Sequence, residues 1–197
     1  MPEIVQTTGE TLRAPSPSDE QLAAAYQRSG ETSLLEELAR RHLPKVSSLV
    51  SQIVLEPSAA EDVTQETFLR AFRRLDSFRG DSQFGTWLYR VALNTAYSHQ
   101  KRRARSPVEY HGGLHEFDTA GTSPDGRMLR AELDSQVRAA LSELSPKLRA
   151  AIVLTSIHGL KAAEAAEIEG CTIATMYWRI HKARKLLHRR LKDYLSP

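Results

Sequence analysis

The chain has 197 residues, 41% of them hydrophobic, and a formal net charge of +3 at pH 7. This length suits one large domain or two small ones. No run of residues approaches the ~18 consecutive apolar positions that a membrane-spanning helix needs, and the polar, acidic N-terminus is unlike a signal peptide. The single cysteine, Cys171, excludes an internal disulfide. We therefore expect a cytoplasmic protein with no membrane insertion.

The N-terminal part is predicted to be a tail followed by a long helical stretch. Residues 1–17 are polar and end in two closely spaced prolines, so we expect a flexible tail. Ser18 precedes Gln21 in the spacing of a capping box, which marks the start of a helix. Apolar residues then recur at helical spacing as far as about residue 53, with breaks or bends expected at Gly30 and Pro44.

Two more helices are predicted before the middle of the chain. Ser58 and Glu61 have the spacing of a second capping box, which predicts a helix that begins at Ser58 and ends near Leu75. Residues 76–83 contain Gly80 and are predicted to form a loop. The next helix is expected at residues 84–103.

Residues 107–127 have a different composition, with four glycines, two prolines and few apolar positions, which is typical of a linker. They separate a module at residues 18–106 from a second at residues 128–195. In the second module, helical spacing and capping residues predict helices at residues 128–144, 146–157, 161–169 and 172–192. No strand-like alternation of useful length is present. The predicted fold class is all-α, with two small helical domains joined by a flexible linker.

The C-terminal helices have the order of a helix-turn-helix, with a short helix, a turn around Gly170 and a long basic helix. After Cys171 the only acid is Asp193. The face expected to pack inward carries Ile173, Met176, Ile180, Ala183, Leu187 and Leu191. The opposite face carries Ala174, Tyr177, Trp178, His181, Lys182 and Lys185. An aromatic and cationic front suits a helix in the major groove, and Thr172 with the first-turn amides can meet a phosphate.

The helix predicted from Ser58 has two distinct faces. Phe68, Ala71, Phe72 and Leu75 form an apolar side, while Asp62, Gln65, Glu66 and Leu69 share the outward side. Acids, an amide and a leucine together make a candidate docking surface, although an ordinary solvated face is the default interpretation.

The segment that follows combines aromatic residues with cations. Aromatics such as Phe78, Phe84 and Tyr97 lie close in sequence to Arg79, Arg90 and the basic block at residues 101–105. Single-stranded DNA is bound by surfaces of this kind, because bases stack on rings while cations follow the phosphates. Trp87 is expected in the core, and Asn94, Tyr97 and Lys101 are expected to be exposed.

Three segments together resemble a known family. AEDVTQETFLRAFRRL (Ala60–Leu75) and DSFRGDSQFGTWLYRVALNTA (Asp76–Ala96) are similar to region 2 of bacterial sigma factors of the extracytoplasmic-function (ECF) subfamily of the sigma-70 family. GLKAAEAAEIEGCTIATMYWRIHKARKLL (Gly159–Leu187) is similar to region 4. The resemblance implies a region 2 bundle and a region 4 helix-turn-helix, with no other domain. It covers most of the chain outside the tail and the linker.

The resemblance also implies roles for individual residues. Docking on the β′ clamp helices of core RNA polymerase falls to Asp62, Gln65, Glu66 and Leu69. Contacts with the −10 element, including capture of a flipped base, fall to Phe78, Arg79, Ser82, Phe84, Asn94, Tyr97, Lys101, Arg102 and Arg103. Contacts with the −35 element fall to Thr172, Thr175, Tyr177, Trp178, His181, Lys182 and Lys185. Expected partners are core RNA polymerase (β′ clamp helices and β flap), promoter DNA and an anti-sigma factor.

One stretch departs from the family pattern. Where most members have a proline, a glycine, a basic residue and a serine, this chain has Thr172, Ala174, Tyr177 and Trp178. The buried positions stay apolar, so the fold is expected to persist. Base specificity cannot be transferred from other members.

The sequence thus predicts a promoter-specificity subunit that directs transcription initiation and is not an enzyme. No catalytic residue, cofactor or metal is expected, because Gly80-Asp81-Ser82 lacks a placed histidine and His111 and His115 lie in a glycine-rich stretch. Two alternatives remain open. One is a free-standing helix-turn-helix regulator, and the other is an interaction protein that titrates an anti-sigma factor.

Overall fold

The computed structural model describes residues 16–105 and 135–195. Within these ranges the chain forms helices and connecting turns with no strand, which confirms the all-α prediction. None of the described helices is long and apolar enough to cross a membrane. The tail predicted at residues 1–17, apart from its last two residues, and the linker predicted at residues 107–127 lie outside the described ranges.

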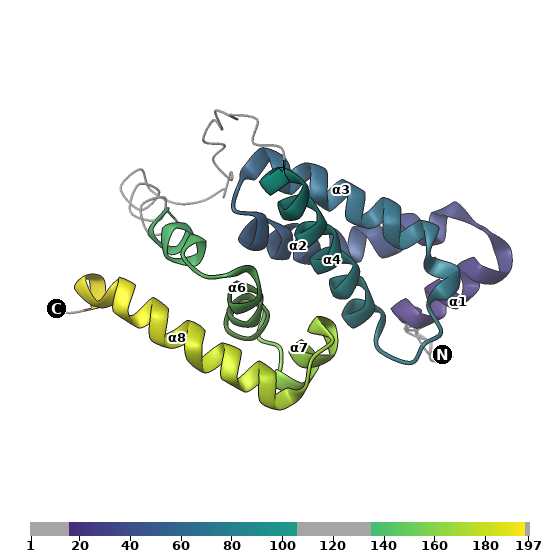
Figure 1. The fold of residues 1–197 in the computed structure, drawn as a ribbon. Coiled ribbons are helices and arrows are strands. Elements are labelled where there is room, and N and C mark those ends of the chain that lie inside the picture. The colour runs from purple at the N-terminus through teal and green to yellow at the C-terminus, as the bar shows by residue number, and fades with distance from the viewer. Residues whose placement is uncertain (1–15, 106–134, 196–197) are drawn as a thin grey trace, which may run out of the picture.

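The helices fall into two groups along the chain (Figure 1). The first group comprises α1 (Asp19–Ser29), α2 (Thr32–Val54), α3 (Pro57–Arg73), the 3-10 turn η1 (Leu75–Ser77) and α4 (Phe84–Arg105). The second comprises a helix at residues 135–142, then α6 (Pro146–Ile152), the π-helical turn η2 (Val153–Ile157), α7 (Ala162–Glu169) and α8 (Ile173–Leu195).

Local sequence signals explain several helix ends in the first group. Ser18 and Gln21 form the expected capping box, and α1 ends at Gly30, whose φ of 69° suits glycine. Pro44 lies inside α2, which continues through it. The capping box expected at Ser58 and Glu61 is wrong, because α3 begins one residue earlier, at Pro57. Proline is favoured at the first helical position, since the amide it lacks would have no partner there.

The first group packs around a buried aromatic and aliphatic core. Phe84 and Leu88 of α4 are fully buried and belong to the same core as Leu38 and Leu49 of α2. Phe78, Phe84 and Trp87 form a cluster of edge-to-face and tilted rings, with centroids 5.5–5.6 Å apart. The expectation that Trp87 contributes to the core is therefore confirmed.

The second group has the order and turns of a helix-turn-helix. Gly170 ends α7 with a φ of 62°, and Thr172 Oγ1 accepts a hydrogen bond from the Thr175 amide at 3.2 Å, which starts α8. Met176, Ile180 and Ala183 are buried as predicted. The inward orientation expected for Ile173 is wrong, since this residue is 49% exposed at the first turn of the helix, beyond the surface that α7 covers.

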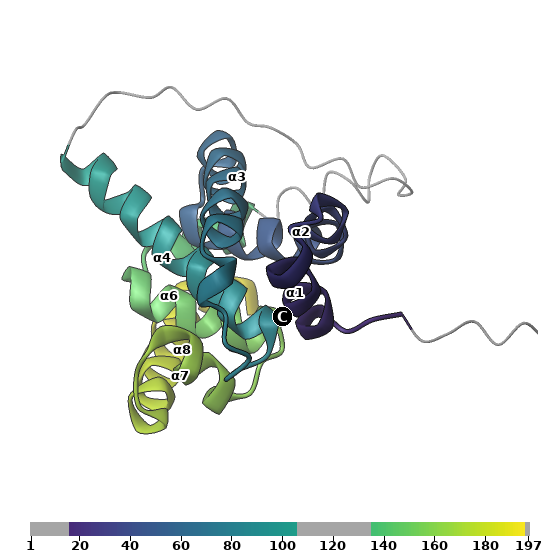
Figure 2. The same ribbon diagram turned by 90° about the vertical axis from the view of Figure 1, so that its right-hand side faces the viewer.

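The two groups pack against each other, and their buried side chains belong to one contiguous core. α4 lies beside α7 (Figures 1 and 2). In addition, α2 contacts η2. Polar contacts also cross this boundary, because Arg149 of α6 donates to the Ile53 carbonyl of α2 at 2.6 Å. The linker composition gave no indication that the domains would meet so closely.

Candidate DNA-binding and partner surfaces

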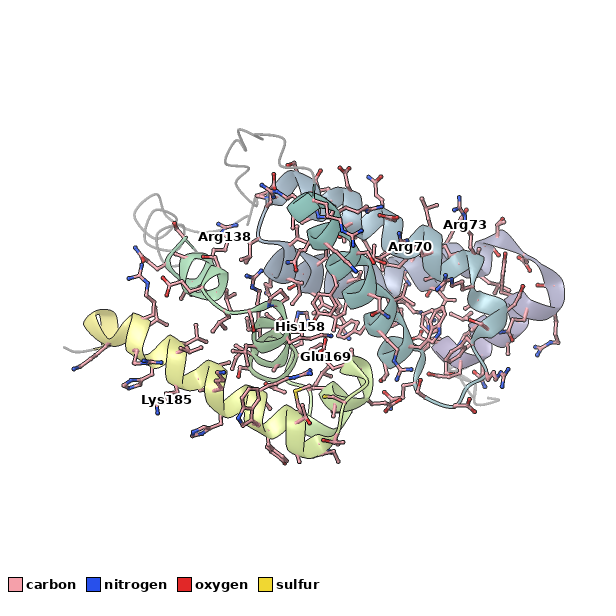
Figure 3. All side chains as sticks on the ribbon, in the orientation of Figure 1. Arg70, Arg73, Arg138, His158, Glu169 and Lys185 are labelled. Carbon is pink, nitrogen blue, oxygen red and sulfur yellow. The ribbon has the colours of Figure 1, made fainter. Side chains whose placement is uncertain are left out.

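The outward face of α8 carries the aromatic and cationic side chains predicted for it. Tyr177 is 61% and Trp178 55% exposed, and His181, Lys182 and Lys185 are also exposed. Figure 3 shows Lys185 pointing away from the rest of the protein. At the start of the helix Thr172 and Thr175 are joined by a hydrogen bond between their hydroxyls of 2.8 Å. The seven residues expected to contact the −35 element thus lie along one accessible side of α8 and its cap.

Several cations of α8 already have partners, among them Arg190, whose Nε lies 2.7 Å from Glu143 Oε1. Lys182 Nζ lies 4.7 Å from the centroid of the Trp178 ring, a cation–π contact. Arg179 points the other way, and its Nη1 donates to Glu169 Oε2 at 2.8 Å.

Glu169, at the end of α7, is the centre of a buried polar cluster (Figure 3). Its side chain is 1% exposed and receives Arg179 together with Lys147 Nζ at 3.0 Å. The Tyr97 hydroxyl of α4 donates to Glu169 Oε1 at 2.6 Å. Burial and the adjacent carboxylate raise the pKa of the Tyr97 phenol well above its ordinary value, so Tyr97 remains a hydrogen-bond donor. Sequence reasoning missed Glu169, because no spacing distinguishes it from the other acids of α7.

Tyr97 was expected to be exposed, but the structure places it half-buried between the two domains. Asn94, one turn earlier on α4, is exposed as predicted. The neighbouring Arg90 also reaches across and donates to the Glu167 carbonyl at 2.8 Å. The side of α4 that carries Tyr97 and Arg90 therefore faces α7 in this conformation.

The loop between η1 and α4 presents fewer aromatic rings than the sequence predicted. Phe78 is 7% and Phe84 0% exposed, so both rings are covered in this structure, and their contact with DNA stays a prediction. Both rings pack against Trp87, and this contact removes their apolar surface from water. Arg79 is exposed and Ser82 half-buried, so these two remain accessible at the loop surface.

Neighbouring helices fix the shape of this loop. Gln27 Nε2 donates to the carbonyls of Leu75 at 2.8 Å and Phe78 at 3.0 Å. The Phe84 amide donates to Glu20 Oε1 at 3.0 Å, and this bond lowers the pKa of Glu20. Because hydrogen bonds with α1 hold both ends of the loop, the backbone that carries Arg79 and Ser82 has a fixed position.

The outward face of α3 matches the predicted docking surface in part. Asp62 and Gln65 are exposed, and Leu69 is 57% exposed, which is unusual for a leucine without a partner. Glu66 is instead half-buried and paired with Arg70 at 2.5 Å and Arg102 at 3.1 Å. Burial acts to raise the pKa of Glu66, but its bonds with these two arginines outweigh burial and lower it.

The basic block at the end of α4 is exposed but partly neutralised. Lys101, Arg102 and Arg103 are all exposed. Arg102 pairs with Glu66, and Arg103 pairs with Glu56 at the start of α3. These ion pairs hold the C-terminal half of α4 beside α3.

Comparisons with known proteins agree with this architecture of a helical bundle joined to a helix-turn-helix. Residues 38–106 match Sigma-70 region 2, and residues 134–187 match Sigma-70 region 4. The chain is 37% identical over 187 residues to the ECF RNA polymerase sigma-E factor of Escherichia coli K12, which covers 90% of this chain and 96% of that protein. It is 34% identical over 186 residues to the RNA polymerase sigma-H factor of Pseudomonas aeruginosa, with 90% and 95% coverage.

Comparison with solved structures also finds sigma factors. CnrH in complex with the cytosolic domain of CnrY is similar with a TM-score of 0.68 and 29% identity, covering 91% of this chain and all of that one. The sigma factor RpoE of Bartonella quintana, in complex with the anti-sigma factor NepR, is similar with a TM-score of 0.65 and 27% identity, covering 80% and 96%. The fold and the two matched regions are those of a bacterial transcription initiation factor. The chain belongs to the sigma-70 family, in its extracytoplasmic-function group.

Proposed function

We propose that this protein is a promoter-specificity subunit that binds core RNA polymerase and directs initiation at promoters with cognate −10 and −35 elements. Residues 18–106 would bind the polymerase and the −10 element, and residues 128–195 would bind the −35 element. The supporting observation is that two exposed surfaces suited to DNA and one suited to a protein partner lie on a single chain. The same chain matches both Sigma-70 region 2 and Sigma-70 region 4.

The contacts divide among three elements. Asp62, Gln65 and Leu69 on α3 would dock on the β′ clamp helices, and region 4 would meet the β flap. Arg79, Ser82, Asn94 and Lys101 would contact the −10 element from the loop and from α4. The −35 element would lie along the exposed side of α8, where the cations attract phosphates and the side chains reach base edges.

In this role the protein catalyses no reaction itself, because core RNA polymerase catalyses RNA synthesis. Since core RNA polymerase works on chromosomal DNA, the same proposal places the protein in the cytoplasm. The similar structures of CnrH and RpoE are complexes with the cytosolic domain of CnrY and with NepR. By analogy with NepR, an anti-sigma factor is the proposed regulatory partner of this chain.

Reconstitution tests the proposal. Added to cognate core RNA polymerase and a library of promoters, the protein should give transcripts that core enzyme alone does not. A pull-down should show the complex with core enzyme. Absence of core binding, together with tight binding of duplex DNA by the free protein, would favour a free-standing regulator instead. Core or anti-sigma binding without transcription would favour the titrating interaction protein.

The docking surface has its own test. Leu69→Ser should weaken core binding at least several-fold, because the exposed leucine would lose its apolar contact with the partner. Leu43→Ser on α2 is the matched control, since Leu43 is 49% exposed but lies on another helix. Circular dichroism should show unchanged helicity in both variants. Equal core binding by the two variants would contradict the assignment of the α3 face.

A further inference from the structure

The first turns of α8 carry an apolar patch on the side that the proposed −35 contact uses. Ile173, Ala174, Tyr177 and Trp178 are all exposed, and the three large residues are between 49% and 61% exposed. Residues three and four positions apart are neighbours on a helix, so these four side chains form one continuous surface. Exposed apolar surface of this kind marks a place where a partner covers it.

The cations on the same turns are directed elsewhere. An arginine or lysine paired with guanine is the commonest specific contact in the major groove. Arg179 cannot make that contact here, because its side chain is 17% exposed and bound to Glu169 at 2.8 Å. Lys182 lies over the Trp178 ring, 4.7 Å from its centroid, and this contact orients both side chains. The part of α8 that would enter the groove first therefore presents rings and methyl groups rather than a guanidinium.

Thymine offers a matching group, because its C5 methyl is the one apolar group on the major-groove edges of base pairs. Covering that methyl with an aromatic ring removes apolar surface of both groups from water. Tyr177 and Trp178 are adjacent, about 1.5 Å apart along the helix axis, and can serve neighbouring base pairs.

We propose that the patch formed by Ile173, Ala174, Tyr177 and Trp178 reads thymines at adjacent positions of the −35 element through their methyl groups. Trp178, held by Lys182, makes the main contact. Lys185 and the other exposed cations farther along α8 bind phosphates and add affinity without choosing a base. The inference rests on the proposed function of α8 as the −35 reader and specifies which bases it selects.

A promoter selection with reconstituted holoenzyme tests base choice. With the −35 element randomised, the wild-type protein should enrich thymine at adjacent positions, and Trp178→Ala should lose that preference at the position Trp178 contacts while the other positions keep theirs. Tyr177→Phe keeps the ring and should keep the preference. Enrichment of guanine at these positions, or a thymine preference that Trp178→Ala leaves unchanged at every position, would overturn the inference while leaving the proposed function intact. Failure of every promoter with wild-type protein would instead count against the proposed function.

Replacing the selected thymines with uracil isolates the methyl group, because uracil lacks it and keeps the same hydrogen-bonding edge. Holoenzyme binding should fall about fourfold per replaced thymine, because burial of one methyl-sized carbon group contributes about that factor. Trp178→Ala should reduce the difference between the thymine and uracil duplexes. Lys185→Ala is the control, since it should weaken both duplexes and leave their ratio unchanged. Equal binding of thymine and uracil duplexes by the wild-type protein would rule out methyl reading.

Discussion

The chemical type of an aromatic residue in this protein does not predict whether its side chain is buried in the core or exposed to a partner. Phe84 has the aromatic side chain of a base-stacking residue, yet it is fully buried and centres the ring cluster at the start of α4. Trp178 is of similar size and character, but it lies 55% exposed on α8. Burial is decided by which helices cover a position, so aromatic type alone could not separate these two roles.

We expect Phe84→Ala to lower the free energy of unfolding by about 3–5 kcal/mol, because it leaves a cavity among Phe78, Trp87 and His42. Trp178→Ala, which truncates a larger but exposed ring, should change stability by less than about 0.5 kcal/mol. Urea denaturation followed by circular dichroism measures both. Similar losses in the two variants would contradict the burial assigned here.

At the scale of elements, polar contacts fix how helices dock. Asp19 of α1 pairs with Arg41 at 2.9 Å and with His42 at 2.8 Å, both on α2. Burial acts to raise the pKa of Asp19, but the bonds to Arg41 and His42 outweigh it and leave the pKa below the ordinary value of 3.8. The folded protein thus binds this proton less tightly than the unfolded chain does.

The sign of that shift predicts acid sensitivity of the α1–α2 contact. A lowered carboxyl pKa stabilises the fold above the unfolded value of 3.8, and the contribution is lost as pH falls through the lower, folded value. We expect Asp19→Asn to reduce stability at pH 7 and to flatten the loss of stability between pH 5 and pH 3. Denaturation series across this range check it. An unchanged slope in the variant would show that Asp19 is not a source of the acid sensitivity.

Arg149 docks elements in the second domain. Arg149 is only 7% exposed. Its guanidinium donates hydrogen bonds to the carbonyls of Leu141, Ser142, Leu144 and Ile53. Burial lowers the pKa of the guanidinium, since water no longer solvates the charge. The carbonyls at the end of the helix at residues 135–142 therefore depend on one side chain from α6.

We expect Arg149→Met to lower stability by several kcal/mol, because it keeps the length of the side chain but leaves those buried carbonyls without a donor (about 1–3 kcal/mol for each one unsatisfied). Arg149→Lys should recover little, since a single ammonium cannot reproduce the planar fork. Thermal unfolding ranks the three proteins. A fully stable Arg149→Met variant would show that water replaces the guanidinium.

At the scale of the whole molecule, the Tyr97–Glu169 bond joins the two domains. Tyr97 cannot reach a DNA base while its hydroxyl is bound to Glu169 and its ring lies under Lys147 Nζ, 4.2 Å from the centroid. The packed arrangement and the contact of Tyr97 with the −10 element that the sequence resemblance implies therefore exclude each other. Contact with DNA through this residue requires the domains to separate.

Tyr97→Phe should loosen the packing of the two domains, because it removes one hydroxyl and leaves a buried carboxylate oxygen with one donor fewer. Small-angle X-ray scattering of the free protein should show a larger radius of gyration than the wild type. Tyr177→Phe is the matched control, since its hydroxyl lies on the exposed face of α8. Equal radii for wild type and Tyr97→Phe would mean that the apolar contacts alone keep the domains together.

The sequence by itself determined the helices, the helix-turn-helix and the exposed face of α8, because helical periodicity, capping residues and glycine positions are local signals. Ser18, Gly30 and Gly170 mark helix ends whose causes lie within a few residues. Only the tertiary structure decided that Phe84 is buried, that Ile173 is exposed and that Tyr97 meets Glu169. These facts depend on which helices cover a position, and contacts of this kind join residues as much as 96 positions apart, as in the Arg149–Ile53 hydrogen bond, where no local pattern carries information.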